Sequence, residues 1–165
     1  MRAGYSVFLI VIILLLMPAN ALAIQKADFV LVVKSKEKLF LIKEDKIIKA
    51  YNVVFGANPK GHKQQEGDER TPEGRYILDF KKSDSAFYKA IRISYPNEQD
   101  REHAARKGVD PGGQIMIHGQ KNGYGWMAPV MQTVNWTDGC IAVTNREMEE
   151  IWQAVDVGTP IVIKP

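Results

Sequence analysis

The chain has 165 residues, with 22 lysine and arginine against 19 aspartate and glutamate, a formal net charge of +3 and a single cysteine, Cys140. This slight basic excess, with no basic stripe interleaved with aromatic residues, gives no support for nucleic-acid binding. A single cysteine cannot form an internal disulfide, which excludes a disulfide-stabilised scaffold.

The first 23 residues have the three parts of a secretory signal peptide. Arg2 and the amino terminus supply a positive region, residues 5–17 an apolar run, and Ala21-Leu22-Ala23 a small-residue cleavage site. An uncleaved anchor is the alternative, but the run is shorter than the roughly 20 apolar residues that span a bilayer. We therefore predict a signal peptide over 1–23, export across the inner membrane, and a single domain over 24–165 with no stable membrane anchor.

The first third of this domain predicts a β-meander. Three short runs are rich in β-branched and aromatic residues: 28–33, 38–42 and 46–55. A polar loop follows over 56–70, and loops of this length in small domains are usually functional or mobile. The turn at 71–74, Thr-Pro-Glu-Gly, then leads into a further predicted strand, 75–80.

The middle of the chain predicts a strand, a polar helix and a second strand. Residues 86–95 have strand character, and Asn97 is a suitable N-cap for a helix at about 98–107. Residues 114–118 form a short apolar strand that ends at His118. The chain therefore delivers a histidine at the end of a buried strand.

The last part predicts a lid, a helix and a strand. The segment 119–139 is rich in glycine and carries three large aromatic residues that suit a lid or substrate wall: Tyr124, Trp126 and Trp136. Thr144 and Glu147 form a capping box that begins an amphipathic helix, and residues 161–163 form the terminal strand. The fold class is therefore a mainly β domain with two short helices.

Cys140 and His118 are candidate catalytic residues. A free cysteine is most often a buried apolar residue, but Gly139 before it permits a tight or left-handed turn whose N–H groups converge on an oxyanion. An ordinary thiol, with a pKa of about 8.5, is mostly protonated at neutral pH, and an imidazole can accept its proton. A zinc site that also uses His62 and His103 is the alternative, but the spacings match no structural zinc pattern.

Two motifs, in this order, carry a family resemblance. Residues 71–76 read Thr-Pro-x-Gly-x-Tyr, and His118-Gly119 is followed by Thr137-x-Gly139-Cys140-Ile141 and then by Asn145. This pattern resembles the signature of the L,D-transpeptidase (YkuD-type) catalytic domain. The resemblance covers about residues 28–165 and implies a β-sandwich-like catalytic fold in a bacterial cell-wall enzyme of the periplasm or cell envelope.

In that family, a cysteine attacks a peptidoglycan tetrapeptide stem, expels the terminal D-alanine and forms a thioester, which an amine resolves into a crosslink. Family members typically accept carbapenems as acylating agents, take part in cell-wall organisation and cell shape, and need no metal or organic cofactor. Carried over, Cys140 is the nucleophile and His118 the general base and acid. The Gly119 carbonyl would orient the imidazole, and the N–H groups around Asp138, Gly139 and Cys140 would form the oxyanion hole. The residues expected to contact the peptide stem are Tyr124, Trp126 and Trp136.

Two positions depart from the family pattern. Asp138 stands where His or Arg is common, and Ala142 where Arg is common. A carboxylate near sulfur raises the pKa of the thiol, and losing the arginine removes a donor for a substrate carboxylate. The acceptor therefore stays open, since an amine would mean a transpeptidase and water an L,D-carboxypeptidase or amidase. An inactive peptidoglycan-binding module is a third reading.

Overall fold

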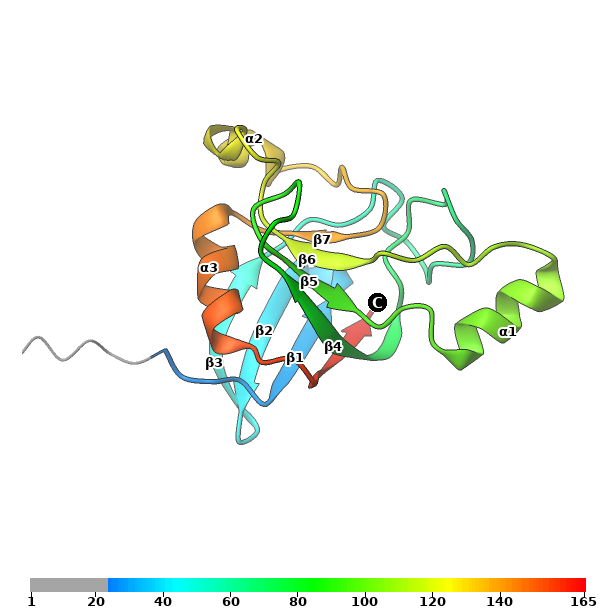
Figure 1. Ribbon diagram of the computed structural model, residues 1–165, viewed down its shortest axis with the longest axis horizontal. Helices are drawn as coiled ribbons and strands as arrows, with labels where there is room; N and C mark the ends of the chain where they lie inside the picture. Colours follow the sequence, from blue (N-terminus) through cyan, green and yellow to red (C-terminus); the bar gives the residue numbers. More distant parts are fainter. Residues whose placement is uncertain (1–23) are drawn as a thin grey trace, which may run out of the picture.

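A computed structural model of the protein describes residues 24–165. The predicted signal peptide, residues 1–23, lies outside the described residues. Eight strands form one continuous sheet in the order β3-β2-β1-β8-β4-β5-β6-β7, and Figure 1 shows how this sheet folds over on itself. None of the helices within 24–165 has the length and apolar character needed to cross a membrane.

The predicted N-terminal meander is confirmed. It consists of β1 (Phe29–Val33), β2 (Lys38–Lys43) and β3 (Lys46–Asn52), with a short 3-10 turn, η1 (Lys34–Lys36), between the first two. Side chains alternate across β1, so that Val30 and Val32 are fully buried. Glu44 and Asp45 both have positive φ, as a tight two-residue hairpin requires.

The remaining strands are β4 (Gly74–Lys82), β5 (Ala90–Ile93), β6 (Met116–His118), β7 (Ile141–Ala142) and β8 (Thr159–Lys164). The predicted strand 86–95 was too long. Lys89 has a φ of 44°, which interrupts the extended chain, so only β5 joins the ladder. β8 pairs parallel to β1 and antiparallel to β4, and so connects the meander to the second half of the sheet.

Two predicted helices are confirmed and one helix was missed. α1 (Glu98–Lys107) and α3 (Asn145–Ala154) begin with the capping boxes of Asn97 and Thr144. In Figure 1, α1 stands away from the sheet at the end opposite α3. The prediction of two helices was wrong, because a four-residue helix, α2 (Ala128–Met131), follows a 3-10 turn, η2 (Gly125–Met127), within the predicted lid. Four residues are too few to show a helical period.

The two ends of the sheet meet next to the candidate site. The N–H group of Val54 donates to the Ala142 carbonyl at 3.1 Å, and that of Ala142 donates back at 2.9 Å. Val54 follows β3, so this bridge joins the chain beyond one edge strand to the other edge strand, β7. The enclosed core is aliphatic, and its fully buried residues include Leu39, Leu78, Ile117, Met148 and Ile151.

Candidate active site

Strand pairing brings the two candidate catalytic residues together. β6 and β7 run parallel with Ile117 opposite Ile141 and His118 opposite Ala142, so Cys140 enters β7 beside the strand that ends at His118. His118 and Cys140 line the same pocket, which has a volume of about 190 Å³. The expectation that His118 and Cys140, distant in the sequence, lie close together in the fold is confirmed.

The tautomer of His118 is fixed by its neighbour. Its Nδ1 lies 2.6 Å from the carbonyl oxygen of Gly119. A carbonyl oxygen only accepts, so Nδ1 carries the proton and Nε2 keeps its lone pair. Burial lowers the pKa of His118, and the hydrogen bond to Gly119 opposes this shift only in part. The imidazole is therefore neutral at pH 7 and can accept a proton at Nε2.

The sulfur of Cys140 is held as a thiol. Its S–H group donates to the carbonyl oxygen of Gln114, with Sγ 3.6 Å away. Burial is the main cause that raises the pKa of this thiol, and the charge of Asp138 adds to it. The backbone N–H of Met116 and the charge of Lys63 act in the opposite direction. A protonated thiol beside a neutral imidazole is an arrangement for general-base activation, in which the proton moves as sulfur attacks.

Gly139 shapes the turn before the nucleophile. Its φ is +123°, and a Cβ there would lie 2.6 Å from the carbonyl oxygen of Arg70. Thr137 ties the same turn, because its hydroxyl donates to the Cys140 carbonyl at 2.7 Å and accepts from the Gly139 N–H at 3.2 Å. Because the Gly139 N–H already donates to Thr137, it is not available to an oxyanion. Of the three expected oxyanion donors, the N–H groups of Asp138 and Cys140 are left. The Asp138 side chain is exposed at the pocket.

An aromatic cluster covers His118. The ring of Phe87 lies 4.4 Å from the imidazole between centroids, and that of Trp136 lies 5.9 Å from it. Both line the pocket. Tyr124 and Trp126, also expected to contact substrate, are instead exposed around η2, with 49% and 76% of their surfaces accessible, and do not line this pocket. Phe87 carried no sequence signal for the site, since it belongs to no motif and fell within the predicted strand 86–95, whose first residues the structure leaves outside β5.

Two side-chain amides, of the buried Gln120 and the half-buried Asn145, brace the chain that follows His118. The Asn145 side-chain oxygen accepts the backbone N–H of Gln120 at 2.8 Å, and the Gln120 side-chain amide donates to the Val143 carbonyl at 2.9 Å. A Cβ on Gly119 would lie 2.7 Å from the same Asn145 oxygen. The Asn145 of the sequence motif therefore supports the backbone beside the histidine, and Gly119 must be a glycine for this close packing.

The other two histidines lie elsewhere. His62 is 3.0 Å from the Asp100 carboxylate through Nε2, and its Nδ1 accepts the Glu73 N–H at 3.0 Å. His62 and His103 line a different pocket beside α1. Over residues 24–165, no group of three or more His, Cys, Asp or Glu side chains is placed to hold a metal ion. The four residues of the zinc alternative are not brought to one site.

The model of the YkuD family, described as the L,D-transpeptidase catalytic domain, matches residues 27–163. The chain belongs to this family. Within it, the YkuD domain is 33% identical over 111 residues to YafK of Escherichia coli (strain K12). That alignment covers 66% of this chain and 37% of YafK, so the chain spans little more than a third of this relative.

Solved structures resemble the YkuD domain over most of its length. The helical cell shape determining protein Pgp2 of Campylobacter jejuni has a TM-score of 0.62 and 26% identity, over 83% of this chain and 48% of Pgp2. Bd1075 of Bdellovibrio bacteriovorus has a TM-score of 0.56 and 24% identity, over 86% of this chain and 51% of Bd1075. An L,D-transpeptidase of Mycobacterium smegmatis shares the fold, with a TM-score of 0.55 and 14% identity. The match covers 83% of this chain and 58% of that protein. The mainly β L,D-transpeptidase fold is thus confirmed.

Proposed function

We propose that this YkuD domain is a cysteine-dependent acyltransferase that acts on peptidoglycan tetrapeptide stems, with Cys140 as nucleophile and His118 as general base and acid. One observation carries the proposal: a buried imidazole with Nδ1 fixed by Gly119 shares a pocket with the thiol. Membership of the L,D-transpeptidase family and the similarity to a cell-shape protein support peptidoglycan as the substrate class.

In the first half-reaction, Nε2 of His118 accepts the Sγ proton as sulfur attacks the carbonyl carbon of the L-centre residue in the stem. Two electrons of the C=O bond move to oxygen, and the N–H groups of Asp138 and Cys140 stabilise the oxyanion. The oxyanion collapses, the C–N bond to the terminal D-alanine breaks, and the imidazolium returns its proton to the leaving nitrogen. A thioester on Cys140 and free D-alanine result.

In the second half-reaction, an amine from a neighbouring stem attacks the thioester carbonyl and gives a proton to His118. The C–S bond then breaks, sulfur regains its proton, and a new amide links the two stems. The product is a crosslink between peptide stems, which would serve cell-wall crosslinking or remodelling. The predicted signal peptide would deliver the domain to the periplasm or cell envelope, where this substrate lies.

Hydrolysis is the second candidate, with water as the acceptor in place of the amine. The pocket favours it in one respect, because none of its lining residues within 24–165 is lysine or arginine. Ala142 is fully buried between β6 and the Val54 bridge. A second stem that enters would therefore find no fixed cation at the pocket for its carboxylate, whereas water needs none.

Product analysis separates the candidates. The purified protein is incubated with a disaccharide tetrapeptide, with and without an added diamino-acid amine, and the products are identified by liquid chromatography and mass spectrometry. A transpeptidase gives free D-alanine and the amine-exchanged or crosslinked stem. An L,D-carboxypeptidase gives D-alanine and the tripeptide alone, and an inactive binding module gives neither. The control is Cys140→Ala, which should release no D-alanine in either enzymatic case.

A further inference from the structure

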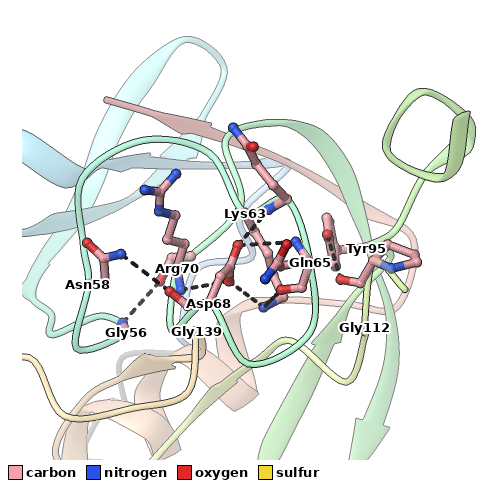
Figure 2. A network of polar contacts seen from close by, with 12 residues as sticks. Gly56, Asn58, Lys63, Gln65, Asp68, Arg70, Tyr95, Gly112 and Gly139 are labelled. Atoms are coloured by element: carbon pink, nitrogen blue, oxygen red, sulfur yellow. Dashed lines mark hydrogen bonds and ion pairs between the residues drawn. The ribbon is translucent and has the colours of Figure 1, made fainter. Parts of the chain in front are cut away.

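The polar loop over 56–70 is a folded structure next to the nucleophile. At its centre is the carboxylate of Asp68, which accepts the backbone N–H groups of Gln64 at 2.7 Å, Gln65 at 3.2 Å and Arg70 at 3.1 Å. Figure 2 shows this carboxylate surrounded by Lys63, Gln65 and Arg70. The sequence predicts a functional or mobile loop. In the structure one side chain accepts hydrogen bonds from three positions of the loop and so holds it in a defined conformation.

The fourth donor to Asp68 is a buried ammonium group. Nζ of Lys63 lies 2.8 Å from the Asp68 carboxylate and 3.1 Å from the Gln65 carbonyl. The side chain of Lys63 is only 3% exposed and that of Asp68 only 11%. Burial opposes ionisation of Asp68, but the three N–H groups and Lys63 outweigh it and hold the pKa of the carboxyl below its usual range. Burying an ion pair costs desolvation free energy, so the pair is weak evidence for a role in stability. Its role is better inferred from the part of the molecule that it contacts.

This loop packs against the glycine that precedes Cys140. A Cβ built on Gly139 would lie 2.6 Å from the carbonyl oxygen of Arg70, and one built on Gly56 would lie 3.0 Å from the Gly139 Cα. Both ends of the loop therefore touch the nucleophile turn through backbone atoms. Asp68 holds the Arg70 end, because Oδ1 accepts the Arg70 N–H. A shift of this carboxylate would be transmitted directly to Gly139.

The loop also places charge near the sulfur. The charged side chains that act on the Cys140 thiol are Asp138, which disfavours the thiolate, and Lys63, which favours it. His118 faces the same pocket in its neutral form. The Lys63 charge thus opposes that of Asp138, and the Lys63 side chain does not line the pocket.

We propose that Lys63 and Asp68 are positioning residues for Cys140: their buried ion pair holds the 56–70 loop against Gly139, and the Lys63 ammonium supplies the positive charge that offsets Asp138. Neither side chain lines the pocket, so both act on Cys140 from outside it, through the loop contact and through the Lys63 charge. The inference rests on the proposed function only in taking Cys140 as the reactive group.

The test is the rate of Cys140 alkylation by iodoacetamide as a function of pH, followed by intact mass. Lys63→Met removes the charge and moves the alkylation midpoint to higher pH, so alkylation at pH 7 slows roughly twofold or more. Asp68→Asn leaves the Lys63 charge unopposed and moves the midpoint to lower pH. Lys63→Arg keeps the charge and the midpoint. Lys60→Met, in the same loop but exposed, is the matched control and leaves the midpoint unchanged.

Opposite shifts for Lys63→Met and Asp68→Asn are the decisive result, because damage to the fold alone moves both in one direction. Shifts of the same sign, or equal midpoints in all the variants, overturn the proposal. If Lys63→Met does not fold, Asp68→Asn decides alone: a midpoint at or above that of the wild type overturns it. Alkylation requires no peptidoglycan turnover, so a failure of the proposed function leaves this test intact.

Discussion

The Nδ1–H of His118 donates to the carbonyl of Gly119, the next residue in the chain, at 2.6 Å. A catalytic histidine is often oriented by a carboxylate, whereas here the orienting group is a backbone carbonyl that carries no charge. Such a partner fixes the tautomer but stabilises an imidazolium less than a carboxylate does. Together with burial of both groups, this favours a resting pair of thiol and neutral imidazole.

This pair has a defined pH signature. Burial raises the pKa of Cys140 and lowers that of His118, so the thiol loses its proton above its ordinary value of about 8.5 and the imidazole gains one below about 6.5. We expect iodoacetamide alkylation of the wild type to have its midpoint above that thiol value, and kcat/KM to hold as the pH falls through 6.5. Rapid alkylation at pH 6 would instead indicate a thiolate–imidazolium pair.

His118→Gln tests the base directly. Glutamine keeps a polar side chain of similar length but cannot accept and return a proton at neutral pH, so D-alanine release should fall about 10²–10⁴-fold. Alkylation at pH 10, where the thiol ionises without help, should stay near the wild-type rate. A variant that retains its activity, with an unchanged thermal midpoint, would remove His118 from the mechanism.

Asp138→Asn should make the thiol more acidic. Removing the carboxylate removes one cause of the raised pKa of Cys140, so the alkylation midpoint should move to lower pH. The side chain is exposed, so the free energy of unfolding should change by no more than about 0.5 kcal/mol. A midpoint that stays in place would show that Asp138 points away from the sulfur in solution.

Gly139→Ala should cost both stability and activity. The positive φ alone costs about 1–3 kcal/mol for a non-glycine residue, and the new Cβ also meets the Arg70 carbonyl at 2.6 Å. Gly158→Ala is the matched control, because its φ is +97° with no atom within 4 Å. Denaturant unfolding should show a larger loss for Gly139→Ala, and only that variant should lose D-alanine release. Equal losses would mean that the close packing of the loop is unimportant.

Local signals account for the parts of the fold that the sequence predicted. The helices α1 and α3 carry capping boxes at their first turns, and β1 and β2 carry continuous apolar runs rich in β-branched and aromatic residues. The four-residue helix α2 has no comparable signal, and Lys89 with positive φ shortened β5 in a way that composition did not reveal.

The residues of the candidate site that belong to sequence motifs could be predicted. Those that reach the site only through tertiary contacts could not. His118, Gly119 and Cys140 were found from their motif, and the Gly119 carbonyl has its expected partner. Phe87 enters the pocket only because its irregular segment crosses beside Trp136. Tyr124 and Trp126 looked equivalent to Trp136 in composition, but the η2 turn carries them to the surface.

Intact-mass spectrometry after incubation with a carbapenem tests the central claim most directly. We expect the wild-type protein to gain the mass of one carbapenem, peptide mapping to place it on Cys140, and Cys140→Ala to gain nothing, while His118→Gln acylates far more slowly. An adduct that persists in Cys140→Ala would contradict the assignment of the nucleophile. No adduct on a folded wild type whose Cys140 still reacts with iodoacetamide would contradict the acyltransferase mechanism itself.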